Sequence, residues 1–460
     1  MADGPFRSQV EWQPQSTDRS GIPTTGPERL SGEGVARGFG NDPRAVVTGR
    51  TGNPGARHGP LESRRKLSSG QRLAVGVVGT GFVARGLARH LARQSDFDLV
   101  ATLTRRPLAS IDDFPAPGVL VETIDALLAR AELVVEVSGD PLHATLVVER
   151  ALERGLPVVT MNAEFHVTVG SAFAGKGLLT EAEGDQPGAL AALAEEARDA
   201  GFRPLVYGNI KGFLNRRPTP AEMRHWSARQ GVSMDVVTAA TDGTKLQYEQ
   251  ALVANGLGAS IACAGLRGYE CQDWKVGARR LAQDAEEGGQ AISDYVLCKA
   301  GPKGVFIAAD HLEEERAALE YFGQGSRPPY LLLRNHYLVH LELPRTIRRI
   351  AEGGSALLSN GECPLVSVAA IAKLPVASGQ SIGRAIGSFE FRGEAVRWCE
   401  YPDHVPMGIV QNARIVRNVE PGAYLRWEDV ELSDHRAVTL AKTIATRVAG
   451  VDASIRSSTA

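Results

Sequence analysis

The feature that most constrains the fold is a glycine-rich turn between a buried strand and a helix. Residues 73–79 form the apolar run LAVGVVG, which predicts a buried strand, and residues 85–93 follow a helical pattern. The turn between them reads Gly79-Thr80-Gly81-Phe82-Val83-Ala84 and fits the pattern G-x-G-x-x-G/A. In this pattern the first glycine permits a tight turn, the second lets the backbone approach a ligand, and the small last residue lets helix and strand pack closely. The order of strand, turn and helix predicts the first unit of a doubly wound α/β fold.

Further strands and helices alternate after this turn. Apolar strands are predicted over residues 98–103, 133–137 and 156–161, with a helix over 143–154. Such alternation predicts a parallel sheet with helices on both faces. Because crossovers between parallel strands are right-handed, the expected arrangement is the Rossmann type of doubly wound sheet.

The turn is expected to bind the pyrophosphate of a dinucleotide at the start of the helix, where amide donors and positive potential meet. After the second strand, many such folds place an acidic residue that bonds the adenosine ribose. This chain has Arg105 and Arg106 there. Two guanidiniums can bind a 2′-phosphate, so NADP is favoured and NAD remains the alternative. The competing interpretation is a pair of arginines on a solvated loop.

Two later turns supply further candidate contacts for the cofactor. Ser138 and Gly139 follow the strand over 133–137, and Asn162 follows the strand over 156–161. Both positions fall at the carboxyl edge of the predicted sheet, where the nicotinamide half of the cofactor is expected. Each residue type is also common in a turn that binds nothing.

In the rest of the chain, the composition and the periodicity of apolar residues change at three places. Its first 70 residues are rich in Gly, Pro, Ser, Arg and Thr without a helical or strand period, which predicts disorder. After the nucleotide-binding part come a mixed region and then short β-type runs separated by turns. The predicted organisation is a disordered segment over 1–70, a dinucleotide-binding domain over 71–165, an α+β substrate and dimerisation domain over 166–362, a small β-rich module over 363–445 and a tail over 446–460.

Composition limits the classes of partner. The 460 residues include 51 Lys and Arg against 53 Asp and Glu, so nothing favours nucleic acid or an anionic membrane. No apolar run reaches the length of a membrane span, and the first residues lack a secretory signal. The five cysteines are widely spaced without a CxxC pair, so neither disulfides nor a metal site is expected. We expect a cytoplasmic protein whose partner is a small-molecule substrate, with a homodimer as one assembly.

Several motifs resemble a known family. The stretches GNIKGFLN over 208–215 and DGTK over 242–245 are similar to substrate motifs of homoserine dehydrogenase, and residues 72–260 share its layout. The tail over 364–440, with VPMG at 405–408 and NVEPGA at 418–423, resembles a SAF domain. The whole resembles homoserine dehydrogenase-like oxidoreductases that carry a C-terminal SAF domain.

One departure limits what this resemblance implies. Homoserine dehydrogenases have a lysine two positions after the asparagine, whereas this chain reads Asn162-Ala163-Glu164. The resemblance therefore implies the fold, the cofactor and an oxidoreductase reaction, but not homoserine as the substrate. An amino-acid-like or a sugar-acid-like carbonyl compound is equally compatible with it.

Hydride transfer at a carbonyl carbon needs a group that donates or accepts the proton on the oxygen. The candidates are Lys211 and Lys245, whose pKa burial is expected to lower. Asp185 and Asp242 are expected to orient the substrate, and Glu164 to do so from beside the nicotinamide. The alternative is that the two aspartates cap helices and Lys245 is solvated.

Three functions are compatible with these residues. The first is an NAD(P)-dependent oxidoreductase with net turnover of the cofactor. The second is a redox-neutral epimerase or lyase that retains the cofactor, and the third is a non-catalytic dinucleotide sensor. Paired lysines and aspartates favour an enzyme over a sensor.

Overall fold

The computed structural model describes residues 72–458. The segment predicted to be disordered, 1–70, lies outside the described residues. Within 72–458 we find no helix with the length and apolar character that a membrane crossing requires.

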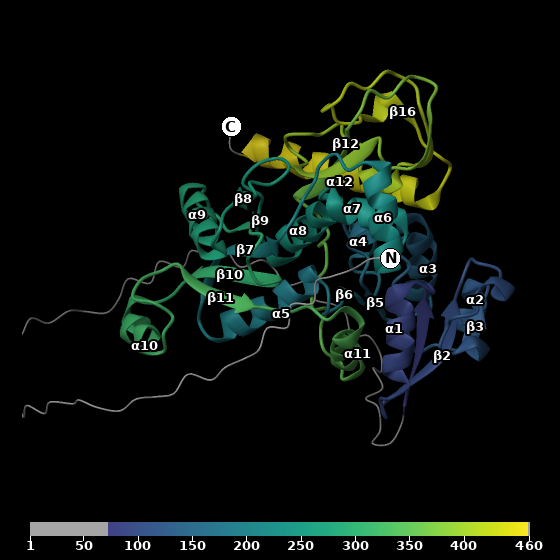
Figure 1. Ribbon diagram of the computed structural model, residues 1–460, viewed down its shortest axis with the longest axis horizontal. Helices are drawn as coiled ribbons and strands as arrows, with labels where there is room; N and C mark the ends of the chain where they lie inside the picture. Colours follow the sequence, from purple (N-terminus) through teal and green to yellow (C-terminus); the bar gives the residue numbers. More distant parts are fainter. Residues whose placement is uncertain (1–71, 459–460) are drawn as a thin grey trace, which may run out of the picture. The chain divides into compact units, whose positions relative to one another are not determined.

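A parallel sheet of six strands forms the first part of the molecule, in the order β3-β2-β1-β4-β5-β6 (Figure 1). This is the Rossmann strand order, and it confirms the predicted fold class. The strands are β1 (Leu73–Val78), β2 (Phe97–Leu103), β3 (Leu120–Val121), β4 (Leu133–Glu136), β5 (Val158–Thr160) and β6 (Leu179–Glu181). The last strand lies beyond the boundary predicted at residue 165, so the sheet extends further along the chain than its sequence pattern indicated.

Helices cover both faces of this sheet because its strands are apolar on both sides. The crossover helices are α1 (Phe82–Leu91), α2 (Ile124–Leu128), α3 (Pro141–Glu153) and α4 (Ala163–Val169). Val75 and Val77 pack on one face with α1, and Val78 packs on the other face with α2, α3 and α4. The distant helix α11 (Leu343–Ala351) joins α1 on the first face.

A second, mixed sheet has the order β11-β10-β7-β9-β8. Its strands are β7 (Arg203–Lys211), β8 (Tyr269–Glu270), β9 (Ile292–Leu297), β10 (Gly304–Asp310) and β11 (Tyr330–Arg334). Helix α9 (Trp274–Glu287) covers one face, where Trp274 packs on Phe306. Helices α5 (Gln186–Asp199) and α8 (Thr244–Leu257) cover the other face. The shorter helices α6 (Pro220–Gln230), α7 (Met234–Thr241) and α10 (Arg316–Tyr321) lie outside these layers.

The C-terminal part is rich in short strands, as its turn-separated pattern indicated. β12 (Val366–Ala372) pairs with β14 (Phe391–Arg397), and β13 (Ser381–Arg384), β15 (Gln411–Ile415) and β16 (Val430–Glu431) form a second small sheet. The final helix α12 (Arg436–Ser458) runs across the boundary predicted at residue 445 and packs against α3 and α4.

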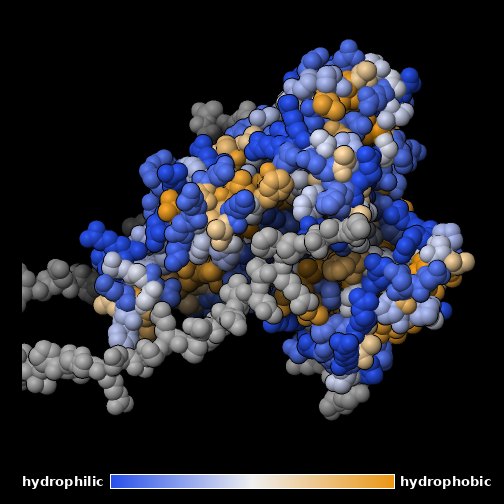
Figure 2. Space-filling model, viewed as in Figure 1, coloured by the Kyte–Doolittle hydropathy of each residue, from blue (hydrophilic) through white to orange (hydrophobic). Residues whose placement is uncertain are grey.

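Large apolar side chains fill these layers, and the surface is mostly polar. Figure 2 shows a face of the described residues that is largely hydrophilic, with separate hydrophobic patches. Two helices are buried over long uninterrupted stretches, α5 over residues 186–194 and α8 over residues 246–254. Polar side chains of these helices are therefore removed from water.

Candidate active site

The glycine-rich turn leaves open space at the start of α1. Gly79 has a φ of +108°, and a Cβ there would lie 3.1 Å from the Ser138 Cα, so glycine suits both the backbone and the close approach. A Cβ on Gly81 would have no atom within 4 Å, and Gly81 is the N-cap residue of α1. Thr80 is buried below the turn, while Phe82 is exposed and Val83 half-buried in the first helical turn. A helix start with free amides and room beside them suits the pyrophosphate of a dinucleotide.

Of the two arginines after β2, Arg106 contacts this turn and Arg105 contacts the loop after β4. Arg106 Nη2 donates to Thr80 Oγ1 at 2.8 Å and to the Thr80 carbonyl at 3.2 Å. Arg105 Nη2 pairs with Asp140 Oδ2 at 2.8 Å, and 57% of the Arg105 side chain is exposed. Burial would raise the pKa of Asp140, but the His143 amide and the two charges of Arg105 and Arg384 outweigh burial and lower it. The two guanidiniums thus stand where the adenosine ribose of a bound dinucleotide is expected.

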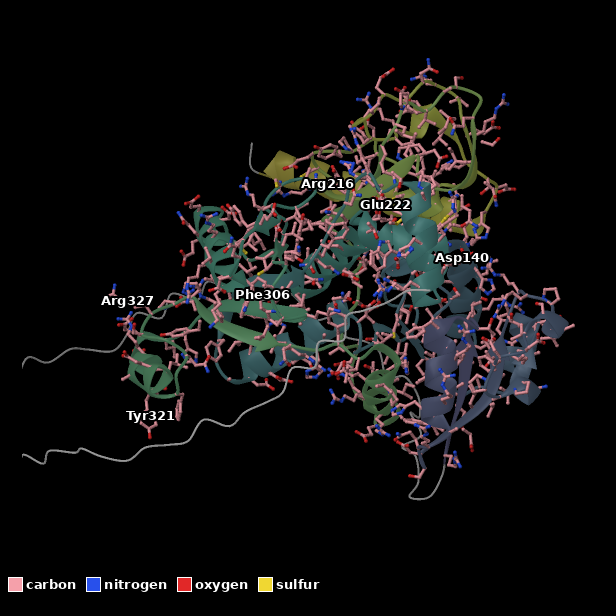
Figure 3. The ribbon with its side chains drawn as sticks, in the orientation of Figure 1. Asp140, Arg216, Glu222, Phe306, Tyr321 and Arg327 are labelled. Carbon is pink, nitrogen blue, oxygen red and sulfur yellow. The ribbon has the colours of Figure 1, made fainter. Side chains whose placement is uncertain are left out.

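The loop after β4 borders the same space. Ser138 donates to the buried carboxyl group of Glu136, from its amide at 2.8 Å and from its hydroxyl at 2.5 Å. Gly139 has a φ of +67°, and no atom lies within 4 Å of a Cβ built on it. Asp140 then begins α3 by accepting hydrogen bonds from the amides of Leu142 and His143. Figure 3 marks Asp140 at this helix start.

Asn162, at the carboxyl end of β5, has structural contacts on both sides of its amide. Its Oδ1 caps α4 by accepting from the Phe165 amide at 3.0 Å. Its buried Nδ2 lies near Glu136, where a hydrogen bond from Asn162 opposes the rise that burial gives the pKa of that carboxyl group. A cofactor contact by Asn162 stays a prediction.

Two lysines and two carboxylates form one cluster, which we call the lysine cluster. Lys245 Nζ lies 2.9 Å from Asp185 Oδ2 and 3.9 Å from Glu249 Oε1. Lys211 Nζ lies 3.2 Å from Glu249 Oε2, which also accepts from Asn209 Nδ2 at 3.2 Å. The structure therefore brings together Lys211, Lys245 and Asp185 from β7, α8 and the N-cap of α5. Glu249 joins them as a residue that the sequence analysis did not single out.

The lysine cluster lies beside the carboxyl ends of β5 and β6. Asp185 follows β6 and caps α5 by accepting from the Gln186 amide at 3.0 Å. Glu164 follows β5 in the first turn of α4, and its charge acts on Lys245. In a doubly wound sheet, ligands bind outside these strand ends.

Burial and pairing set the charges of this cluster. None of the Glu249 side chain is exposed, and burial raises the pKa of Glu249 to about 7 even though Lys211 and Lys245 oppose the shift. For Lys245, burial lowers the pKa, but Asp185, Glu249 and Glu164 outweigh burial and hold the pKa above its ordinary value. For Asp185, burial is likewise outweighed, chiefly by Lys245, and the pKa is lowered.

These shifts correct one expectation from the sequence. Burial was expected to lower the lysine pKa, whereas Lys245 is held as a cation by its carboxylates. Glu249 is the member of the cluster whose pKa falls near neutrality. A buried carboxyl group with this pKa is suited to accept and release a proton at working pH.

Two more side chains border the cluster. The Gln186 amide, oriented by its neighbours, accepts from Lys211 Nζ at 3.0 Å and donates to Glu249 Oε1 at 3.1 Å. The pKa of Tyr337 is raised, by burial first and then by the charges of Glu249 and Asp185, which places this ring close to the cluster. Glu249 had a signal in the sequence, since it stands four residues after Lys245 on a predicted helix. Tyr337 had none, because it reaches the site from a distant loop.

Asp242 lies outside the lysine cluster. Its Oδ2 pairs with Lys373 Nζ at 2.9 Å, and both side chains are buried. Its Oδ1 accepts from the Thr244 amide at 3.0 Å, next to Gly243, whose φ is +91°. Asp242 therefore stabilises the turn between α7 and α8, whose N-cap residue is Gly243, and its role in orienting a substrate stays a prediction.

Comparisons with known proteins agree with this geometry in two regions. A family model described as "Homoserine dehydrogenase, NAD binding domain" matches residues 79–171, and one described as "Oxidoreductase DRL, catalytic domain" matches residues 184–343. The first covers the glycine-rich turn, and the second covers all four residues of the lysine cluster. The chain is an oxidoreductase that binds a nicotinamide dinucleotide. Neither model reaches the region in which the SAF resemblance was predicted, and neither supports homoserine as the substrate.

Solved structures that are similar to this chain include three dehydrogenases. A putative myo-inositol dehydrogenase from Sinorhizobium meliloti is 15% identical, with 63% of this chain and 92% of that chain covered and a TM-score of 0.37. A UDP-N-acetylglucosamine 3-dehydrogenase from Acidithiobacillus ferrooxidans is 14% identical, with 63% and 92% covered and a TM-score of 0.38. A D-galactose-1-dehydrogenase from Rhizobium etli is 16% identical, with 62% and 90% covered and a TM-score of 0.38. Similarity at this level says nothing about the substrate of this chain, and no curated protein matches the sequence.

Proposed function

We propose that this protein transfers a hydride between NADP and a small polar carbonyl or hydroxyl compound, amino-acid-like or sugar-acid-like, and that the lysine cluster handles the proton. The observation that carries the proposal is the buried Glu249, with a pKa of about 7, bonded to Lys211 beside the carboxyl ends of β5 and β6. Such a pair supplies the proton donor and acceptor that hydride transfer at an oxygen-bearing carbon requires.

The nicotinamide ring, when bound, accepts or supplies the hydride. Lys211 is the member of its pair that faces outward, since 19% of its side chain is exposed against none of Glu249. In the oxidising direction, Lys211 takes the hydroxyl proton of the substrate while its own proton passes to Glu249; reduction reverses both transfers. A carboxyl pKa near neutrality keeps both forms of the pair accessible.

Lys245 has a different role from Lys211. Its paired carboxylates keep it protonated, so it acts as a fixed positive charge and not as a base. Placed against the substrate oxygen, a cation stabilises the negative charge that develops there. Asp185 holds Lys245 in this position at 2.9 Å, and 35% of the Lys245 side chain remains exposed to a ligand.

The choice of NADP over NAD rests on Arg105 and Arg106. Arg106 is oriented by two contacts with Thr80 in the glycine-rich turn, and Arg105 pairs with Asp140 in the loop after β4. No carboxylate follows β2 at residues 104–107 to bond a ribose diol or repel a 2′-phosphate. A phosphate between two arginines would form charge-assisted, bidentate hydrogen bonds.

The sensor alternative explains the buried charges poorly. Removing a carboxylate and a lysine from water costs several kcal/mol per ion, roughly, before pairing offsets it. A protein that only binds a dinucleotide has no need to place four ionisable groups together at the substrate side of the sheet. A redox-neutral enzyme would use the same groups, and it would differ in retaining its cofactor through purification.

Turnover of wild type and two lysine variants tests this proposal. The reduced nicotinamide is followed by its near-ultraviolet absorbance with a panel of hydroxy acids, amino-acid semialdehydes and sugar-acid carbonyl compounds. With the best substrate, Lys245→Met and Lys211→Met should each lower kcat by about 10²–10⁴-fold, the range for loss of a positioned proton-transfer or charge-stabilising group. The matched control is Lys275→Met, because Lys275 is exposed on α9. If both lysine variants keep the kcat of the control, the lysine cluster does not carry the reaction.

A further inference from the structure

The C-terminal β-rich module, residues 364–435, contacts the nucleotide sheet at the loop after β4. Arg384, the last residue of β13, donates from Nη2 to the Gly139 carbonyl at 2.7 Å. Its Nη1 pairs with Asp235 Oδ2 at 2.7 Å, in the first turn of α7. One guanidinium therefore joins three separate parts of the chain.

Packing around the loop after β13 adds to the ion pair with Asp235 in holding Arg384 in place. Gly387 has a φ of +76°, and a Cβ there would come within 2.2 Å of the Asp235 carbonyl oxygen. The loop after β13 thus lies directly on the start of α7. This close approach holds the loop that follows Arg384 against the helix turn that carries Asp235.

The loop that Arg384 contacts is a ligand-binding position in this fold. The strand order reverses between β1 and β4, and ligands bind outside the carboxyl ends of the strands at such a reversal. On the other side of the loop, Arg105 pairs with Asp140 at 2.8 Å. Gly139 and Asp140 are consequently held between two guanidiniums, one from β2 and one from the C-terminal module.

The same module also contacts the helix that carries Lys245. Lys373 pairs with Asp242 at 2.9 Å, just before α8. The Gly393 amide donates to Thr244 Oγ1 at 2.9 Å in the first turn of that helix. The module therefore touches both the dinucleotide loop and the start of the lysine-bearing helix.

We propose that the C-terminal module is part of the dinucleotide site, and that Arg384 is a positioning residue that sets the β4–α3 loop for the cofactor. The inference rests on the proposed function for the identity of the ligand. It assigns to the module a role in cofactor affinity, through a contact that neither matched family model includes.

Calorimetric titration of the full chain with NADPH tests the role of Arg384. Arg384→Ala should raise the dissociation constant about tenfold, the usual consequence of losing one charge-assisted hydrogen bond. Arg384→Lys should recover part of the affinity, because it keeps the charge but not the fork that reaches Gly139 and Asp235 together. The melting temperature of both variants should stay within about 3 °C of wild type, since the ion pair is partly exposed.

The matched control is Arg436→Ala. It removes another ion pair between the C-terminal part and α3, Arg436 with Glu149 at 2.7 Å, away from the loop after β4. The dissociation constant of NADPH for Arg436→Ala should equal that for wild type. An unchanged constant in Arg384→Ala would overturn the inference, and so would equal losses in Arg384→Ala and Arg436→Ala. A wild-type chain that binds no NADPH or NADH would instead refute the proposed function on which the inference rests.

Discussion

Glu249 is a carboxyl group on the buried helix α8, and its ionisation is linked to stability. Burial raises its pKa to about 7 from the 4.5 of an unperturbed glutamate. Between these two values the folded chain holds a proton that the unfolded chain has released. The contribution of Glu249 to stability is therefore complete below pH 4.5 and is lost as the pH rises through 7.

Replacing this carboxyl group by an amide should remove that pH dependence. We expect the free energy of unfolding of wild type, relative to Glu249→Gln, to fall by roughly 3 kcal/mol between pH 4.5 and pH 7.5. Urea unfolding of both proteins across this range measures the difference. Parallel curves would mean that Glu249 titrates in the folded chain as it does in the unfolded one.

Sequence reasoning found part of the site at this scale. Lys211, Lys245 and Asp185 stood in short motifs of glycine and polar residues, and the structure brings all three together. Asp242 stood in a similar motif, but it is bonded to Lys373, which follows it by 131 residues in the chain. A local motif cannot reveal a partner that the fold supplies from such a distance.

At the scale of the elements, the close contact between helix α1 and the loop before α11 requires a glycine at position 86. A Cβ on Gly86 would lie 2.5 Å from three atoms of the His340 ring, which also stacks edge-on against Phe82 at 5.8 Å. The loop that carries His340 also carries Tyr337 to the lysine cluster. The contact thus links the position of this loop to the helix that begins at the dinucleotide turn.

Gly86→Ala should therefore destabilise the protein by about 1–2 kcal/mol, because overpacking outweighs the better helix propensity of alanine. His340→Ala in the same chain should restore most of the loss by making room for the methyl group. A double-mutant cycle in urea measures the coupling between the two sites. Additive effects would show that the ring moves away without cost.

A helix or strand could be predicted where the periodicity of its own residues is long enough to identify it. The alternation of apolar strands and amphipathic helices gave the Rossmann sheet, whose strands are buried on both faces. The third and sixth strands are only two and three residues long, which is too short for a period to be seen. The place of α11 against α1 follows from packing between distant segments, which no local pattern contains.

At the scale of the whole molecule, the described parts converge on the carboxyl edge of one sheet. The nucleotide sheet supplies the turn, the two arginines and Asn162, the middle region supplies the lysine cluster, and the C-terminal module reaches the loop after β4 through Arg384. A substrate held by the lysine cluster would lie beside the strand ends where the nicotinamide is expected. This convergence is the structural reason for proposing an oxidoreductase and not a binding protein.

The most direct test is calorimetric titration of the full chain with NADPH and with NADH, repeated on the Arg105→Ala, Arg106→Ala double variant. We predict that wild type binds NADPH more tightly than NADH, and that the double variant loses tenfold or more of its affinity for NADPH, roughly the effect of removing a charge-assisted phosphate contact, while its affinity for NADH changes little. Equal losses of affinity for NADPH and NADH would show that the arginines support dinucleotide binding without contacting a 2′-phosphate. Absence of binding to either cofactor by wild type would contradict the central claim.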